Sequence, residues 1–567
     1  MIIDTYVRLP HTFINMLQKL KTYIPDWAKK PQDKIEKALN LPKPIRAVKG
    51  QPTRQYADHA SKSYMELKLA FRDVGRMNAI IETLGRDFLT AMPEGAYVSR
   101  LGQIAFLYRR LHEDLSKESI IRLLEESKTH AATNPADWDD WNLANLREIE
   151  STIRHHVGVP PDLIEKKARL SYEGRHVHRD VLKNNEWEQG RTFLEGMVEL
   201  HQRIADYKQL EDNTHPEARY QSLLREYMPG ARIEQMDHLF SGYKREIDKL
   251  YPQIMAAQNS RGQPYDMEGV FSGKSQMWLN RSLLKMIGFD FERGGLYETG
   301  HNPVEGGTPD DTRLVIKTAK IGTFLDSMKS ALHEGGHGLY IQGLPRKQWR
   351  YQPVGQDLGA LIHESQALLI EMILGRKKEF FDFLAPRAEG VFQRFSDPTM
   401  TADNLWRLKN RVGKSIDRKS ADEVTYFLHI HMRTEIERKL ISGDLKVSDL
   451  PDAWAHYSKE LFGTKPRTNA EGCLQDVHWF VGKFGYFPSY ALGHMLAAQL
   501  YEALLRDIPT IPSMLREGEY GDIHIWLNHK IYQKGRLQNT DTLIESITGE
   551  PLSYAALVRH IRNRYLN

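Results

Sequence analysis

The stretch 331-ALHEGGHGLYIQG-343 contains His333, Glu334 and His337 in the pattern H-E-x-x-H. On a helix, residues four apart lie on one face with Cβ atoms about 5–6 Å apart, so two imidazoles can bind one metal ion. Glu334 lies one step round from His333, close enough to act on a water at that metal. The pattern therefore predicts a metal site with Glu334 as its general base.

The same stretch predicts a helix, because apolar side chains from Phe324 to Ile341 form a broad stripe. Gly335, Gly336 and Gly338 oppose this prediction, since each costs about 1 kcal/mol relative to alanine in a helix interior. Three glycines in four positions indicate that another segment approaches the helix closely.

A second motif, 363-HESQ-366, offers the third ligand that a catalytic zinc site needs besides its open fourth position. Glu364 lies in the next apolar-rich run, 361–374, so a neighbouring helix would deliver its carboxylate. His363 is the rival third ligand. The longer pattern H-E-x-x-H-x-x-G-x-x-H requires glycine and histidine where Tyr340 and Gly343 stand, so that type of site is excluded.

Composition sets broad limits on the protein. The chain has 567 residues, 41% of them hydrophobic, which is enough for a large core. A net charge of +4 spread along the chain gives no case for a nucleic-acid or membrane partner. The lone cysteine, Cys473, excludes an internal disulfide and suits a reducing compartment. The start lacks a signal-peptide pattern, and no run of 18 apolar residues occurs, so we expect a cytoplasmic protein.

The pattern of apolar residues and prolines divides the chain into two parts. Residues 1–60 are expected to form a helical extension, with helices at about 11–24 and 31–40 and a basic, proline-containing linker at 41–55. Residues 61–567 are expected to form one catalytic domain. Its helical patterns cover 56–84, 95–128, 137–157, 160–172, 186–211, 216–227, 233–257, 401–413, 421–441 and 491–505, and the segment from there to 567 is also helical.

Strand signals are few. The glycine-rich segment 289–311 is expected to be a loop, and 312-TRLVIKT-318 is expected to be a strand because of its β-branched residues. A second candidate strand is 414-KSIDRKS-420. We expect a small sheet beside the metal helix in an otherwise helical body, where strands flanking a cleft hold an extended peptide.

Five segments together resemble the carboxypeptidase Taq family of metallocarboxypeptidases. They are HEGGHGLYIQGLP, HESQ, ADEVTYFLHIHMRTEIERKLISGDLKVSDLP, EGCLQDVHW and GYFPSYALGHMLAAQL. The resemblance runs from about residue 62 onward and leaves residues 1–60 outside it. The segment at 311–315 departs from the family pattern D-x-R-x-T, because Val315 stands in place of its threonine.

The resemblance implies a mainly α fold with two lobes, a deep active-site cleft and a homodimeric assembly. It implies removal of single amino acids from peptides with a free C-terminus, using zinc or sometimes cobalt. His333 and His337 match the metal histidines, Glu334 the general base and Glu364 the third ligand. Gln475 belongs to a family motif present here as 472-GCLQ-475, and we expect it to contribute to substrate binding.

Hydrolysis and exopeptidase action require further groups. The oxyanion of the tetrahedral intermediate needs a donor besides the metal, and His478, Tyr486 and Tyr490 are the candidates. The terminal carboxylate needs a cation, preferably a guanidinium. Arg418, just before the A-D-E segment, is the first choice and Arg313 the second. All five residues also have structural interpretations, as core aromatics or salt-bridge partners.

Two other functions remain open at this level. A helical zinc oligopeptidase that cuts inside short peptides would share the same ligands but tolerate a blocked C-terminus. A helical scaffold with a chance motif would bind no metal.

Overall fold

The computed structural model describes residues 61–567 except 157, 209–216, 299–303 and 319–322. The chain divides into two units, Met1–Lys43 and Pro44–Asn567. The helices expected at 11–24 and 31–40 lie outside the described residues, and the division at residue 60 stays a prediction.

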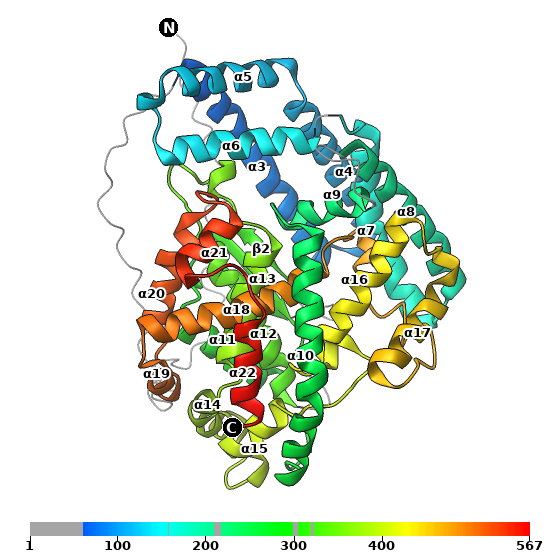
Figure 1. The fold of residues 1–567 in the computed structure, drawn as a ribbon, viewed down its shortest axis with the longest axis vertical. Helices are drawn as coiled ribbons and strands as arrows, with labels where there is room; N and C mark the ends of the chain where they lie inside the picture. The colour runs from blue at the N-terminus through cyan, green and yellow to red at the C-terminus, as the bar shows by residue number, and fades with distance from the viewer. Residues whose placement is uncertain (1–60, 157, 209–216, 299–303, 319–322) are drawn as a thin grey trace, which may run out of the picture. The chain divides into compact units, whose positions relative to one another are not determined.

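The first half of the described chain is a series of helices (Figure 1). Ser61 starts the series, since its hydroxyl accepts a hydrogen bond from the backbone N–H of Tyr64. The helices are α3 (Lys62–Thr90), α4 (Tyr97–Leu115), α5 (Glu118–Thr133), α6 (Asp140–His156), α7 (Pro161–Asn184), α8 (Trp187–Lys208), α9 (Ala218–Tyr227) and α10 (Ile233–Ser260).

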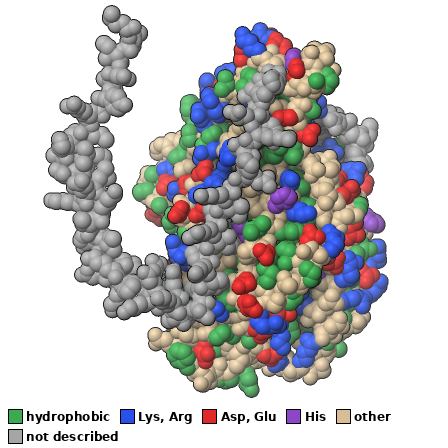
Figure 2. All heavy atoms as spheres, turned by 90° about the vertical axis from the view of Figure 1, so that its left-hand side faces the viewer, with side chains coloured by type: hydrophobic (Ala, Val, Ile, Leu, Met, Phe, Trp, Pro, Cys, Tyr) green, Lys and Arg blue, Asp and Glu red, His purple; other side chains and the backbone are tan. Residues whose placement is uncertain are grey.

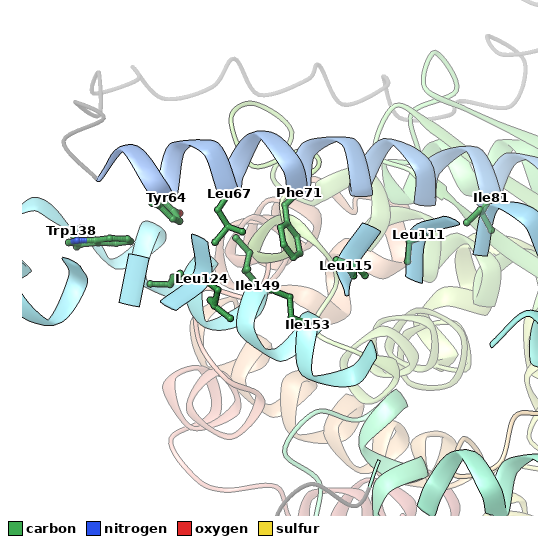
Figure 3. Packing of buried hydrophobic residues seen from close by; sticks show 11 residues of the cluster. Tyr64, Leu67, Phe71, Ile81, Leu111, Leu115, Leu124, Trp138, Ile149 and Ile153 are labelled. Carbon is green, nitrogen blue, oxygen red and sulfur yellow. The ribbon is translucent and has the colours of Figure 1, made fainter. Parts of the chain in front are cut away.

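Helices α3 to α6 share one apolar core (Figure 3). Leu67 and Phe71 of α3 are buried against Leu115 of α4 and Ile149 and Ile153 of α6. Because these residues recur at three- and four-residue spacing, each helix directs one face inward. The periodicity of the sequence therefore predicts this part of the fold.

The second half contains the metal motifs. Its helices are α11 (Gly273–Ile287), α12 (Phe324–Gly343), α13 (Ala360–Leu368), the π-helix η5 (Leu369–Leu374), α14 (Lys378–Phe392), α15 (Ala402–Lys409), α16 (Tyr426–Ser442), α17 (Leu450–Phe462), α18 (Pro488–Asp507), α19 (Ile511–Glu517), α20 (Gly521–Lys530), α21 (Thr540–Thr548) and α22 (Ala555–Tyr565). The prediction of a mainly α protein with a small sheet is confirmed.

The sheet lies against α12 and has the strand order β1-β3-β2. Strand β1 (Gly294–Glu298) is parallel to β3 (Asp311–Ile316), and β2 (Val304–Thr308) is antiparallel to it. The predicted strand at 312–318 is confirmed. The loop expected at 289–311 is wrong, because it contains β1 and β2. Both are rich in glycine, which has low strand propensity, and a Cβ at Gly294 would collide with the carbonyl oxygen of Thr312.

The strand expected at 414–420 is also wrong. The segment is irregular and ends in a single 3-10 turn, Arg418–Ser420. The carboxylate of Asp417 caps this turn by accepting a hydrogen bond from the backbone N–H of Lys419. A local side-chain bond of this kind competes with strand pairing, which the sequence pattern does not reveal.

The glycines of α12 lie where neighbouring elements approach most closely. A Cβ at Gly336 would lie 2.6 Å from the Cα of Ala367 in α13, and one at Gly338 would lie 2.7 Å from the ring of Phe289. A Cβ at Gly335 would lie 2.5 Å from a methyl group of Leu284 in α11. The close approach expected from the sequence is therefore confirmed.

Charges of both signs are interspersed over the part of the face visible in Figure 2 that the grey atoms leave uncovered. No single helix in the described residues is long and apolar enough to cross a membrane; a pair bent by 77°, Pro353–Leu374 with Lys378–Phe392, meets the length and composition criteria jointly.

Candidate metal centre

Three predicted ligands converge in the structure. His333 and His337 of α12 and Glu364 of α13 each offer one ligand atom within 4.8 Å of the others. Nε2 of His333 is 3.8 Å from Oε1 of Glu364, and Nε2 of His337 is 3.5 Å from Oε2. The side chains of His337 and Glu364 are buried and that of His333 is partly exposed to solvent.

The other ring nitrogen of each histidine has a protein partner. Nδ1 of His333 lies 3.2 Å from Oε2 of Glu371, and Nδ1 of His337 lies 3.0 Å from the carbonyl oxygen of His363. Both partners accept, so each Nδ1 donates and each Nε2 lone pair faces Glu364. His363, the rival third ligand, is not part of this group of donors. Its carbonyl oxygen orients His337, and its ring stacks on the ring of His337 with the centroids 4.4 Å apart.

Glu371 contacts a candidate ligand and was not identified from the sequence. It lies in the π-helix η5, is 3% exposed, and its other oxygen accepts from Arg376 at 3.2 Å. Burial alone would raise its pKa, but the hydrogen bond to His333 and the cations Lys329 and Arg376 lower it. One signal was present: Glu371 lies about two turns after Glu364 in an otherwise apolar run.

The donor set fits a divalent transition metal. Two imidazole nitrogens and one carboxylate are the ligands of catalytic zinc sites, which keep a fourth position open. Glu334 follows His333 on α12 and its side chain is 5% exposed. The predicted general base is therefore a buried carboxylate next in sequence to a ligand.

A second cluster contains Arg418. Its Nε and Nη2 both donate to Oδ1 of Asp476, at 2.9 and 2.8 Å. Oδ2 of the same carboxylate is 2.5 Å from Nε of the fully buried Arg433. Although burial alone would raise the pKa of Asp476, the two guanidinium groups lower it well below its usual range. One carboxylate therefore serves two cations, which leaves an excess positive charge beside Arg418.

Gln475 positions this cluster. Its amide oxygen accepts from the backbone N–H of Arg418 at 3.1 Å and from Nη2 of Arg433 at 2.7 Å. Its amide nitrogen donates to the carbonyls of Ile416 and Glu471. These bonds use its acceptor and both donors within the protein. Asp476 and Arg433 were not identified from the sequence, although Asp476 adjoins Gln475 in the segment 471-EGCLQDVHW-479.

The three oxyanion candidates lie together. Nε2 of His478 is 3.1 Å from the hydroxyl oxygen of Tyr490, and the ring of His478 packs on Phe487 at 4.4 Å. Burial and the charge of Arg418 lower the pKa of His478 well below its usual range, so the ring is neutral. The rings of Tyr486 and Tyr490 are in edge contact at 5.3 Å.

The environments of the two tyrosines differ. Burial, followed by the negative charge of Glu364 among other groups, raises the pKa of Tyr490, while Arg418 opposes the shift. Tyr486 instead packs edge-on against Tyr227 at 5.2 Å and lies under the ammonium group of Lys483. Tyr490 therefore lies beside His478 and near the charges of Arg418 and Glu364.

Arg313 lies apart from these clusters on β3. Its Nε and Nη2 form a two-pronged pair with Asp311 at 2.8 and 2.9 Å. The structure thus brings Arg418, Gln475, His478 and Tyr490 together and gives Arg313 a partner within its own strand.

Two histidines one helical turn apart, with a glutamate from a neighbouring helix, define a metallopeptidase of the H-E-x-x-H class. The family model described as "Carboxypeptidase Taq (M32) metallopeptidase" matches residues 66–565. The chain belongs to this family, and its activity is that of a metal-dependent carboxypeptidase.

Carboxypeptidases of known sequence and structure are similar to this chain. Carboxypeptidase 1 of Bacillus subtilis is 34% identical over 377 residues, which cover 66% of this chain and 73% of the relative. Thermostable carboxypeptidase 1 of Thermus thermophilus is 29% identical and covers 86% of this chain and 96% of its own. The structure of Trypanosoma cruzi metallocarboxypeptidase 1 superposes with a TM-score of 0.83 at 30% identity, over 89% of this chain and all of that one.

Proposed function

We propose that the protein releases single amino acids from peptides with a free C-terminus, using a zinc ion held by His333, His337 and Glu364. The observation that carries the proposal is the convergence of these three donors within 4.8 Å. A cobalt or other divalent ion in the same ligands would serve the same chemistry. A divalent ion there supplies Lewis acidity, which lowers the pKa of water toward about 7 and polarises a carbonyl.

Glu334 is proposed as the general base. Its buried carboxylate takes the proton of the attacking water and returns it to the leaving amine. Glu371 and the carbonyl of His363 hold the two imidazoles in the tautomer that presents Nε2. This fixed orientation keeps Glu334 and the two histidines in one geometry through the reaction.

Arg418 is proposed to bind the terminal carboxylate. Only one edge of its guanidinium is taken by Asp476, and Nη1 is 3.4 Å from the hydroxyl of Tyr426. Because Asp476 is shared with Arg433, the cluster has a net positive charge that a carboxylate neutralises. Recognition of this charge would restrict the enzyme to chain ends.

Tyr490 is proposed to donate a hydrogen bond to the oxyanion of the tetrahedral intermediate. For this role Nε2 of neutral His478 donates to the hydroxyl oxygen of Tyr490, which lies 3.1 Å away, and the O–H of Tyr490 is left to donate to the oxyanion. The hydroxyl of Tyr490 is then already aligned when negative charge develops on the oxyanion in the transition state.

The proposal also covers the partners, the assembly and the compartment of the protein. Peptides are the partners, and a homodimer is the assembly that the family resemblance implies. The cytoplasm is the proposed compartment, because the single cysteine, Cys473, is buried and burial raises its thiol pKa to about 12, which suits a protein without disulfide chemistry.

Mass spectrometry of a mixed peptide pool tests the function. We expect ladders of C-terminal shortening that stop when a chelator is added and that are absent for C-amidated peptides. Internal cuts in amidated peptides would identify an oligopeptidase instead. An unchanged pool with the zinc-loaded protein would contradict the proposal.

A further inference from the structure

Arg564, near the end of α22, reaches the helix that supports the metal site. Its Nη1 donates to the carbonyl oxygen of Met372 at 2.7 Å, and its Nη2 donates to that of Ile373 at 2.8 Å. Both carbonyls belong to the π-helix η5. The Arg564 side chain is 3% exposed, so these bonds are made in a low-dielectric interior, where they are strong.

The same guanidinium binds Glu423, which is fully buried. Nη1 of Arg564 lies 2.6 Å from Oε2 of Glu423. That carboxylate also accepts from the hydroxyl of Tyr565 at 3.0 Å and from Nε2 of His560 at 3.1 Å, and Nε2 of His494 lies 3.4 Å away. We call these five residues the Glu423 cluster. It joins α22 to α18 and to the segment just before α16.

The Glu423 cluster therefore adjoins both the candidate metal ligands and the group that contains Arg418 and Tyr490. On one side, Met372 follows Glu371, whose carboxylate holds Nδ1 of His333 at 3.2 Å. On the other, Glu423 lies five positions after Arg418, and α18 carries Tyr490. Figure 1 shows α22 next to α18, against which it packs.

The fork of an arginine suits this position. Its planar guanidinium directs several N–H groups in fixed directions, so one side chain sets two carbonyls and a carboxylate relative to one another. A π-helix is a departure from regular helical bonding that occurs often at functional sites. Donors from outside fix where its carbonyls lie, and with them the direction of Glu371.

We propose that Arg564 is a positioning residue of the metal site, acting through the η5 carbonyls and Glu371 to hold His333 in place. It touches neither metal nor substrate. The inference rests on the ligand set of the proposed function. It adds that α22, far from the ligands in sequence, contributes to metal affinity.

Metal affinity of the full chain tests the proposal. Zinc binding is measured by competition with a chelator for the wild type, Arg564→Lys and Arg564→Met. Arg564→Lys keeps the charge for Glu423 but loses the fork, so we expect about tenfold weaker zinc binding, and a larger loss for Arg564→Met. We also expect kcat to fall with KM little changed, because Arg418, which is proposed to bind the terminal carboxylate, keeps its contacts with Asp476.

Arg559 provides the matched control. It lies on the same helix, is 52% exposed and pairs with Glu502 at 2.7 Å. Arg559→Lys and Arg559→Met should bind zinc within about twofold of the wild type, as expected for a surface ion pair. Folded Arg564→Lys with wild-type zinc affinity would overturn the positioning role. A wild type that binds no zinc would instead remove the proposed function.

Hydrogen exchange gives a second test that needs no variant. Coupling between two sites is reciprocal, so if Arg564 supports the metal site, zinc binding must stabilise α22. We expect slower amide exchange in 555–565 after zinc is added to the wild-type protein. Unchanged exchange in this helix, with slower exchange in α12, would overturn the proposal even if Arg564 variants fail to fold.

Discussion

At the scale of single residues, the site assigns different tasks to the two nitrogens of each metal-site histidine. Nδ1 contacts Glu371 or the carbonyl of His363, which leaves Nε2 as the nitrogen that faces Glu364. Helical spacing predicts the two histidines, because periodicity is a local property, whereas Glu364 was preferred to His363 through the family resemblance. Spacing does not predict the supporting residues, because Glu371, Asp476 and Arg433 act through tertiary contacts that it does not encode.

Replacing Arg418 should remove the preference for free chain ends. Arg418→Ala leaves Asp476 paired with Arg433, so the protein should fold. Activity on free-carboxylate peptides should fall about 10- to 100-fold, and the ratio of rates on free and C-amidated peptides should fall with it. Arg313→Ala, which breaks only the pair with Asp311, is the control. An unchanged ratio in Arg418→Ala would show that another group binds the carboxylate.

The two neighbouring tyrosines form a matched pair for the oxyanion role. Tyr490→Phe should lower kcat by roughly 10²- to 10³-fold with little change in KM, since the donor acts in the transition state. Tyr486→Phe removes the same atom from a ring that packs on Tyr227 and should have a much smaller effect. Steady-state kinetics of both variants decides the assignment, and equal or reversed effects would refute it.

At the scale of elements, the close packing of α12 on α13 brings the histidines to Glu364. The glycine content of α12 predicted a close approach, and Gly336 meets the α13 backbone. Strands β1 and β2 were missed for the related reason that glycine has low strand propensity, so sheet packing rather than local preference decides them. The segment 414–420 was misassigned because Asp417 and Gln475 fix its path.

Gly336→Ala should destabilise the protein despite the higher helix propensity of alanine. Propensity favours alanine by about 1 kcal/mol, but the added Cβ would lie 2.6 Å from backbone atoms of Gln366 and Ala367, which cannot move cheaply. We expect a net loss of roughly 1–3 kcal/mol in urea unfolding, together with weaker zinc binding.

Gly102 of α4 is the control for this substitution. It is exposed, and a Cβ there meets nothing within 4 Å. Gly102→Ala should therefore raise the free energy of unfolding by up to about 1 kcal/mol. Equal stabilisation by both substitutions would mean that α12 and α13 are not in close contact.

At the scale of the whole molecule, the fold buries histidines in their neutral form. His178 of α7 is 4% exposed, and its Nε2 lies 2.8 Å from the carbonyl oxygen of Leu474, to which it donates. Burial, opposed in part by this hydrogen bond, lowers its pKa to about 4. His201 of α8 is similarly buried, with its pKa lowered to about 3. Such groups make stability depend on pH.

Stability should fall as pH drops below about 6.5, the pKa of histidine in an unfolded chain. Between that pH and about 4, His178 binds a proton in the unfolded chain but stays neutral in the folded protein, so acid favours unfolding. Above pH 6.5 both states are neutral and the full stability is present. His178→Gln keeps an N–H donor but does not titrate. Between about pH 7.5 and pH 5 its free energy of unfolding should therefore fall by roughly 2 kcal/mol less than that of the wild type.

Urea unfolding of both proteins at the two pH values measures this difference. The comparison uses changes with pH within each protein, so a constant effect of the substitution cancels. An identical pH dependence in the wild type and His178→Gln would mean that folding does not lower the pKa of His178.

The metal content of purified, zinc-loaded protein tests the central claim most directly. Elemental analysis should find about one zinc per chain in the wild type and in Glu334→Gln, which should be inactive, but little in Glu364→Gln. Retention of zinc by Glu364→Gln, or turnover by Glu334→Gln, would contradict the assignment of three ligands and one base.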